Sequence, residues 1–293
     1  MAAADSPDLH GSVIVITGGN SGIGKEAAVA LATLGATTVI TARNAAKGEE
    51  ALAEIRERSG SATVEVMALD LADFASIRAF SADFHERFDR LDVLINNAGG
   101  ILTERQLTAQ GFEVTFGVNH LGHFLLTDLL LDRLKASAPS RVVNVASVAH
   151  RYAFSGLAFD DLQSDRGYQS MNVYGKSKLA NVLFTTELAR RLDGSGVTAN
   201  CLHPGPVATG FGSADDTTGI ERVTMMLGRP FFIGAERGAR TIVFLASAPE
   251  VAGETGGYYV RSKRHTASKA GRDTDAARRL WEASEALVAS VPA

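Results

Sequence analysis

Short apolar runs alternate with longer amphipathic segments along most of the chain. The runs are rich in Val, Ile, Leu and Ala, and they cover residues 13–17, 38–42, 64–69, 93–96, 141–146 and 197–202. The intervals leave room for helices: residues 26–34 show helical apolar spacing, and residues 45–58 are predicted to form a charged helix. Strands that alternate with helices form a parallel sheet covered on both faces. The pattern therefore predicts an α/β protein with a doubly wound parallel sheet.

The same pattern favours a single domain, although the length alone would allow two. We predict a flexible N-terminal segment at 1–11, a sheet domain over 12–260, and a C-terminal extension at 261–293. This extension begins with a basic loop and ends in a helix over about 273–291. Parallel sheets bind ligands outside the carboxyl ends of their strands, so the residues that follow each run are the candidates for function.

Composition excludes several classes of protein. The 293 residues carry a formal net charge of −4, which provides no basic footprint for nucleic acid. Cys201 has no intramolecular disulfide partner, which suits a reducing cytoplasm, and the seven scattered histidines do not suggest structural zinc. Every apolar run is far shorter than the ~18 residues of a membrane span, and residues 1–11 lack the basic residues of a signal peptide. We therefore expect a cytoplasmic protein without a metal centre.

A glycine-rich segment follows the first apolar run. Its glycines are spaced G-x-x-x-G-x-G in Thr17-Gly18-Gly19-Asn20-Ser21-Gly22-Ile23-Gly24. Glycine lets the backbone approach a pyrophosphate, and the following helix offers free N–H groups and a positive dipole end. The alternative is an ordinary strand-to-helix turn. Because the segment opens the first strand–helix unit, we predict a dinucleotide site formed by Gly18, Asn20, Ser21, Gly22, Ile23 and Gly24.

The end of the second apolar run bears on the choice between NAD and NADP. Folds that bind NAD usually place an acidic residue about 20 positions beyond the glycines, on the ribose 2′-hydroxyl. Here no acidic residue follows the run before Glu49. Arg43 can instead form a fork on a 2′-phosphate, with Lys47 one helical turn further. The alternative is two solvated basic residues at a helix start. We predict NADP(H) as the cofactor.

Two further runs end in candidate cofactor contacts. Asp70 and Leu71 follow the third run, and Asp70 can accept from an adenine amino group. Alternatively Asp70 caps the next helix, a position for which Asp73 competes. The fourth run is followed by small residues that let a loop pass close to a cofactor, which alone indicates only a turn. These small residues are Asn97, Ala98 and Gly99.

The sequence Tyr-x-x-x-Lys places Tyr174 and Lys178 on one face of a helix. A phenol with an ordinary pKa near ~10 exchanges its proton poorly at neutral pH. We expect the Lys178 ammonium, together with an oxidised nicotinamide, to lower the pKa of Tyr174. Tyr174 can then donate a proton to a carbonyl oxygen or accept one in the reverse direction. The alternative is a surface pair without chemistry.

Two polar residues are candidates to complete this group. Ser147 follows the fifth run, where its hydroxyl can hold a substrate oxygen beside Tyr174; alternatively it caps a helix or turn. Asn119 lies in an apolar stretch predicted to be one helix over 116–131. A buried amide there can bind a water and relay protons to Lys178, or it can be a satisfied core asparagine.

Together these motifs resemble the short-chain dehydrogenase/reductase family over roughly residues 12–260. The resemblance is carried by residues 17–24 and 96–99, and by Asn119, Ser147, Tyr174, Lys178, Pro204 and Gly205. It implies a Rossmann-type fold and an Asn–Ser–Tyr–Lys tetrad formed by Asn119, Ser147, Tyr174 and Lys178. It also implies that Lys178 contacts the nicotinamide ribose and that Thr209 holds the nicotinamide carboxamide, with further cofactor contacts at Pro204, Gly205 and Val207.

Finer features resemble the retinol dehydrogenase-like branch of that family. They are residues 41–44, 118–124 and 203–205, and the long stretch between Ser147 and Tyr174 that includes residues 159–162. The membrane-anchoring N-terminus of many such enzymes is not expected here, which puts retinoids as the natural substrate in doubt. His120 and His123 have the spacing of two metal ligands, but without a third ligand we interpret them as structural.

The segment 205–234 is predicted to cover the cleft as a substrate lid. Its Met225, Met226, Leu227, Phe231 and Phe232 suit a bulky hydrophobic substrate, although a dimer contact or ordinary core explains them equally well. We expect NADPH-dependent reduction of a small hydrophobic ketone or aldehyde, such as an aromatic polyketide of secondary metabolism or a retinoid-like compound. The first alternative is a non-catalytic NADP(H)-binding redox sensor, and the second is a sugar-nucleotide epimerase or dehydratase. The sequence leaves the oligomeric state open.

Overall fold

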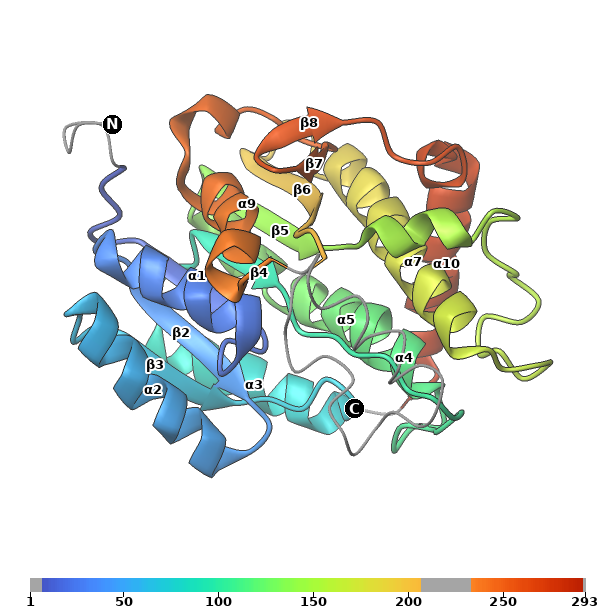
Figure 1. Ribbon diagram of the computed structural model, residues 1–293, viewed down its shortest axis with the longest axis horizontal. Helices are drawn as coiled ribbons and strands as arrows, with labels where there is room; N and C mark the ends of the chain where they lie inside the picture. The colour runs from blue at the N-terminus through green and yellow to red at the C-terminus, as the bar shows by residue number, and fades with distance from the viewer. Residues whose placement is uncertain (1–6, 207–232, 292–293) are drawn as a thin grey trace.

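The computed structural model describes residues 7–206 and 233–291, and they form a single α/β domain around an eight-stranded sheet (Figure 1). The strand order is β3-β2-β1-β4-β5-β6-β7-β8. All neighbouring strands are parallel except β7 and β8, which are antiparallel. The strands are β1 (Val13–Ile16), β2 (Thr37–Ala42), β3 (Val64–Ala68), β4 (Val93–Asn96), β5 (Ser140–Val145), β6 (Val197–His203), β7 (Tyr258–Val260) and β8 (Lys263–His265). The predicted doubly wound parallel sheet is confirmed.

Helices cover both faces of the sheet, and alternate residues of β1 show the two layers. Ile14 and Ile16 belong to the core beneath α1 (Gly22–Thr33), α2 (Ala45–Ser59) and α9 (Ala235–Ser247). Val13 and Val15 belong to the opposite core. The helices over that core are α3 (Phe74–Arg87), α5 (Gly122–Leu129), α7 (Ser170–Arg191) and α10 (Thr274–Ala289). In Figure 1, α7 and α10 lie side by side at the end of the molecule away from α2.

Local signals set several helix ends. Asn44 caps α2 by accepting a hydrogen bond from the backbone N–H of Lys47 at 3.0 Å, and Gly60 ends the helix with φ +70°. Asp73 caps α3, so the capping role weighed for Asp70 belongs to Asp73.

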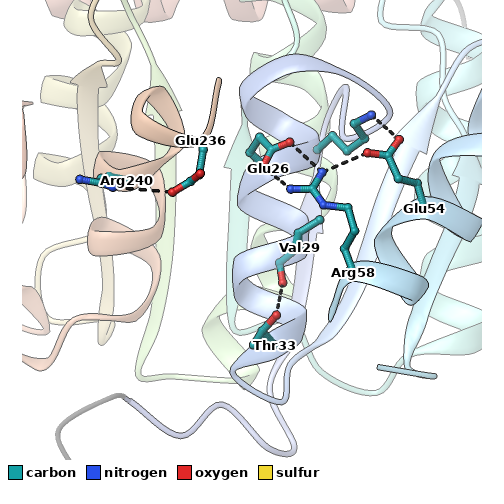
Figure 2. A network of polar contacts seen from close by, with 8 residues as sticks. Glu26, Val29, Thr33, Glu54, Arg58, Glu236 and Arg240 are labelled. Atoms are coloured by element: carbon teal, nitrogen blue, oxygen red, sulfur yellow. Dashed lines mark hydrogen bonds and ion pairs between the residues drawn. The ribbon is translucent and has the colours of Figure 1, made fainter. Parts of the chain in front are cut away.

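On the outer face, Arg58 of α2 pairs with Glu26 of α1 at 2.7 Å and with Glu54 at 3.0 Å (Figure 2). In the described part of the chain, no helix has the length and apolar character needed to cross a membrane.

The prediction of one continuous helix over 116–131 is wrong. The chain forms α4 (Val114–Phe116), a π-helical turn η1 (Gly117–Leu121) and α5, and then continues as α6 (Leu131–Ala136). A π-helical turn holds more residues than an α-helical turn. Apolar periodicity does not reveal it here, because nearly every side chain over residues 115–127 is buried. A tertiary contact accompanies it: a Cβ at Gly122 would lie 2.6 Å from the Leu71 carbonyl oxygen.

The predicted basic loop after residue 260 also differs from the structure. It contains the strand β8 and the short 3-10 turn η5 (Ala270–Arg272). The preceding strand, β7, was not predicted because three residues are too few to show a period. Every side chain of β8 is exposed, so that strand has no apolar pattern. Two other short 3-10 turns, η2 (Val148–Tyr152) and η4 (Pro249–Val251), follow β5 and α9.

The two ends of the predicted domain fall partly outside the described residues. Within the predicted N-terminal segment 1–11, the backbone N–H of Leu9 donates to the Leu34 carbonyl oxygen at 2.9 Å. Of the predicted lid 205–234, residues 207–232 lie outside the described residues. The N–H of Ile233 donates to the Pro206 carbonyl oxygen at 2.8 Å, so the described ends of this segment meet.

Candidate active site

The glycine-rich segment forms a tight turn between β1 and the N-terminus of α1. Gly18 and Gly22 have φ values of +63° and +54°, which L-residues with side chains rarely adopt. A Cβ at Gly24 would lie 2.5 Å from both the Gly18 carbonyl oxygen and the Asn97 Nδ2. Ser21 occupies the N-cap of α1 without a side-chain hydrogen bond, so it leaves the first N–H groups of the helix for another acceptor. This cradle fits the pyrophosphate of a dinucleotide.

The loop after β4 is bound directly to this cradle. The N–H groups of Asn97 and Ala98 donate to the Thr17 Oγ1 at 2.8 and 2.9 Å. The Asn97 side chain donates to the Thr17 carbonyl oxygen at 2.8 Å, while its Oδ1 is buried without a partner among the described residues. An unpartnered buried acceptor beside the glycines suits a ligand that donates a hydrogen bond. The structure therefore brings residues 97–99 together with the predicted dinucleotide loop.

The two residues predicted to bind a 2′-phosphate follow the end of β2. The Gly18 N–H donates to the Thr41 Oγ1 at 3.3 Å, so this strand end adjoins the cradle. Arg43 and Lys47 follow, and both are exposed. Within residues 7–206 and 233–291, neither side chain forms an ion pair with an acidic residue. Two unengaged cations at this place fit a phosphate.

The candidates after β3 differ from one another. The Asp70 carboxylate accepts a hydrogen bond from the Ala72 N–H at 2.9 Å, and Asp70 is partly exposed. Leu71 is 6% exposed and its side chain belongs to the core, so only its backbone is available to a ligand. Asp70 therefore keeps a carboxylate at this edge of the sheet, whereas Leu71 does not present a side chain there.

Ser147 and Tyr174 form the centre of the candidate catalytic group. Ser147 directly follows Ala146 at the end of β5. Its Oγ accepts a hydrogen bond from the Ala149 N–H at 3.1 Å, so Ser147 caps η2, which is the alternative role considered for it. The Ser147 side chain is also hydrogen-bonded to the Tyr174 side chain. One hydroxyl group thus serves both the local turn and the tyrosine on α7.

Lys178 lies one helical turn after Tyr174 and is 3% exposed. Its Nζ lies 5.7 Å from the centroid of the Tyr174 ring and donates to the Val145 carbonyl oxygen at 3.0 Å. A Cβ at Gly99 would lie 3.2 Å from this Nζ, so the lysine reaches the loop after β4. The structure therefore brings Ser147, Tyr174 and Lys178 to the same edge of the sheet as the glycine cradle.

Burial shifts the pKa of both titratable groups. It raises the pKa of Tyr174 to about 12, although the hydrogen bond with Ser147 acts in the opposite direction. Burial lowers the pKa of Lys178 to about 8. The predicted lowering of the Tyr174 pKa involves an oxidised nicotinamide as well as the ammonium, and it stays a prediction. In the chain alone, desolvation of the phenolate dominates. At neutral pH the chain therefore holds Tyr174 as a protonated phenol.

Asn119 lies in the π-helical turn and is completely buried. Its Oδ1 accepts from the Gly100 N–H at 2.9 Å. Its Nδ2 donates to the Gly100 carbonyl oxygen and to the Ser177 Oγ, both at 2.9 Å. Both amide protons are thus engaged, which matches the satisfied asparagine rather than a side chain that donates to water. Asn119 fixes the loop after β4 against α7.

The remaining predicted contacts lie after β6. Gly205 has φ +97°, and a Cβ there would lie 2.8 Å from the Ile233 Cδ1. Pro204 and Gly205 are partly exposed. Val207, Thr209 and the five apolar lid residues that suit a hydrophobic substrate lie outside the described residues.

Sequence reasoning missed the contacts of two histidines. The His150 Nδ1 lies 2.6 Å from the Ser147 carbonyl oxygen, and its Nε2 accepts from the Ser268 N–H at 3.1 Å. His123, considered only as a metal ligand, lies 2.9 Å from the Thr17 Oγ1. In the sequence, the only signal for these contacts was that His150 comes three residues after Ser147 and His123 four residues after Asn119. Among residues 7–206 and 233–291, no three His, Cys, Asp or Glu side chains gather as a metal site.

Comparison with known proteins gives concordant matches. A model of the short chain dehydrogenase family matches residues 12–159 and 162–218. Mouse Retinol dehydrogenase 12 is 47% identical over 279 residues, which cover 94% of this chain and 86% of the relative. An uncharacterised protein from Mycobacterium paratuberculosis superimposes with a TM-score of 0.77 at 36% identity, over 99% of this chain and 97% of that chain. The Pseudomonas aeruginosa RhlG/NADP complex has a TM-score of 0.68 at 27% identity, over 86% and 94% of the two chains.

Proposed function

The chain belongs to the short chain dehydrogenase family, in the branch of the retinol dehydrogenases, and from this we propose that it is an NADPH-dependent carbonyl reductase. Its substrate would be a bulky hydrophobic ketone or aldehyde, which it reduces to an alcohol. The observation that carries the proposal is the Ser147–Tyr174 hydrogen bond, with Lys178 one turn along α7. These groups lie at the edge of the sheet that also holds the glycine cradle.

In this proposal Tyr174 is the proton donor. When bound, the nicotinamide cofactor supplies a hydride to the carbonyl carbon. The Tyr174 phenol, protonated because burial raises its pKa to about 12, passes its proton to the carbonyl oxygen and regains one from solvent. The Ser147 hydroxyl orients the same oxygen and donates a hydrogen bond to the charge that develops on it. The Lys178 ammonium provides positive charge beside the phenolate that remains.

The choice of NADPH rests on the end of β2. Arg43 and Lys47 are exposed there, and no acidic residue lies between the end of β2 and Glu49 to hold a ribose 2′-hydroxyl. The Pseudomonas aeruginosa RhlG structure, a structural neighbour at 27% identity, is a complex with NADP. Arg43→Asp removes the guanidinium fork and repels a phosphate, so we expect the NADPH/NADH preference to fall by about tenfold to a hundredfold. Arg278→Asp on α10, far from α2, is the charge-matched control, and an unchanged ratio for Arg43→Asp would contradict the assignment.

The substrate class rests on apolar side chains beside the catalytic group. Val148 follows Ser147 and is 42% exposed, while Met171 precedes Tyr174 on α7 and is 47% exposed. Tyr152 is 52% exposed, and it lies close to Gly175, the residue after Tyr174: a Cβ at Gly175 would be 3.4 Å from the Tyr152 Cβ. Large exposed apolar side chains at a site favour a hydrophobic ligand. Aromatic polyketide-like and retinoid-like carbonyl compounds are therefore the classes to test first.

A panel of carbonyl compounds tests the reaction, with the loss of NADPH absorbance as the measurement. We expect turnover with bulky aromatic ketones or aldehydes, and Tyr174→Phe to lower kcat by about 10²–10⁴-fold because it removes only the proton donor. Tyr168→Phe is the matched control, since that phenol donates to the Leu102 carbonyl oxygen at 3.0 Å. NADPH binding without turnover across the panel would contradict the proposal and favour a redox sensor. Turnover of nucleotide sugars alone would favour an epimerase or dehydratase.

A further inference from the structure

His123 connects the cofactor cradle to the π-helical turn that carries Asn119. The histidine lies near the start of α5, one turn after Asn119, and is 2% exposed. Its Nδ1 lies 3.2 Å from the Asn119 backbone carbonyl oxygen. Its Nε2 lies 2.9 Å from the Thr17 Oγ1 at the end of β1. One imidazole ring thus spans two segments that are far apart in the sequence.

The neighbours of the ring define its hydrogen-bond roles. A carbonyl oxygen only accepts, so the Nδ1 carries the proton and donates to Asn119, and the Nε2 accepts from the Thr17 hydroxyl. The Thr17 oxygen in turn accepts from the N–H groups of Asn97 and Ala98. Burial lowers the pKa of His123 to about 3, and the nearby Lys178 ammonium acts in the same direction. The ring is therefore neutral at neutral pH, as this arrangement requires.

We propose that His123 is a positioning residue, which holds the Asn119 turn at a fixed place relative to the cofactor cradle. The inference rests on the proposed function and adds a residue to it. Asn119 binds Gly100 through both its Oδ1 and its Nδ2, and the adjacent Gly99 lies against Lys178. A displaced turn would therefore move the loop after β4 relative to the catalytic lysine. Displacements of about 1 Å at such sites lower rates by about a hundredfold.

The chain offers a variant that removes both hydrogen bonds of the ring and keeps its bulk, His123→Phe. We expect kcat to fall by about tenfold to a hundredfold. The Thr17 hydroxyl can turn to the Ile95 carbonyl oxygen at 3.3 Å and still accept from residues 97 and 98. The Kd for NADPH should therefore stay within about threefold of wild type. A lower kcat with an unchanged Kd for NADPH would distinguish a positioning role of His123 from general damage to the fold.

Two further variants make the test selective. An asparagine places its amide N–H near the position of the histidine Nδ1, so His123→Asn should recover most of the kcat that His123→Phe loses. The control is His120→Phe, because His120 is equally buried but its Nε2 lies 2.8 Å from the Ser284 Oγ of α10. That variant should lower the melting temperature with kcat within about twofold of wild type. Equal kcat values for wild type and His123→Phe would overturn the inference.

A spectroscopic readout tests the arrangement without any turnover. In ¹⁵N-imidazole NMR spectra, the signals missing from His123→Asn identify His123, and we expect a protonated Nδ1 and an unprotonated Nε2. A protonated Nε2 would overturn the inference even in an active enzyme. If wild type binds NADPH but reduces no compound of the panel, the proposed carbonyl reduction fails. The NMR tautomer then decides by itself whether His123 connects Thr17 to Asn119.

Discussion

The outer face of α1 and α2 and the interior beside α5 both carry polar clusters, but the two stand in different surroundings. On the outer face, the side chain of Arg58 is 38% exposed and shares Glu26 and Glu54 (Figure 2). In the interior, Thr17 and Asn119 are completely buried, and neither carries a charge. An exposed ion pair gains little over hydration, whereas a buried group that loses its partner keeps its full desolvation cost. Burial, more than charge, should therefore decide which cluster matters for stability.

The buried ammonium of Lys178 gives the largest expected effect. Its pKa is lowered from 10.5 to about 8, so between these pH values the unfolded chain binds a proton that the folded chain lacks. The free energy of unfolding should therefore rise with pH across this window. Lys178→Met removes the titration, and relative to it wild type should gain about 3 kcal/mol from below pH 8 to above pH 10.5.

Urea unfolding of the cofactor-free proteins at several pH values measures this difference. Taking the difference between wild type and Lys178→Met cancels the other groups that titrate there, such as Tyr174. Arg58→Ala is the control, because it removes an exposed cation and should leave the pH dependence of wild type intact. Parallel pH curves for wild type and Lys178→Met would show that the lysine is not desolvated, and the comparison between the two regions would fail.

The amide of Asn119 tests the neutral part of the buried cluster. Asn119→Leu has a similar volume but leaves the Gly100 N–H, the Gly100 carbonyl and the Ser177 Oγ without their partner. We expect the free energy of unfolding to fall by about 2 kcal/mol, measured by urea denaturation at neutral pH. A change below about 0.5 kcal/mol would show that these groups find other partners.

The exposed cluster gives the smallest expected effect. Arg58→Ala breaks the pairs with Glu26 and Glu54, and the loss should be below about 1 kcal/mol because water replaces both partners. The loss should shrink further in about 1 M salt, where exposed charges are screened. A loss as large as that of Asn119→Leu, unchanged by salt, would mean that the outer cluster stabilises the chain as strongly as the buried one.

Much of the fold could be read from apolar periodicity. Six predicted runs correspond to β1–β6 within a residue or so at each end, because the strands of a parallel sheet are apolar on both faces. The strands β7 and β8 escaped prediction because they are short and β8 is exposed. The π-helical turn escaped because nearly every side chain over residues 115–127 is buried, so the stretch has no polar face in which a shift of phase would show.

In the candidate site too, some features were predicted from the sequence and others were not. Spacing alone predicted that Tyr174 and Lys178 share one helix face, and strand order predicted that Ser147 lies beside them. The burial of Tyr174, which raises its pKa in the chain alone, was not predicted, because spacing conveys proximity and not burial. The roles of His123 and His150 were also missed, since each contacts a residue more than 100 positions away.

The sequence by itself determined the first six strands and their alternation with helices, the glycines that the tight turn requires, and the residue types available for proton transfer. These depend on local geometry and on spacing, which a linear chain specifies directly. Only the tertiary structure decided which polar atoms are satisfied, which charges are desolvated, and that a single histidine joins Thr17 to Asn119. Such properties depend on the distance between segments remote in sequence and on the exclusion of water, and both arise only when the sheet and its helical layers pack together.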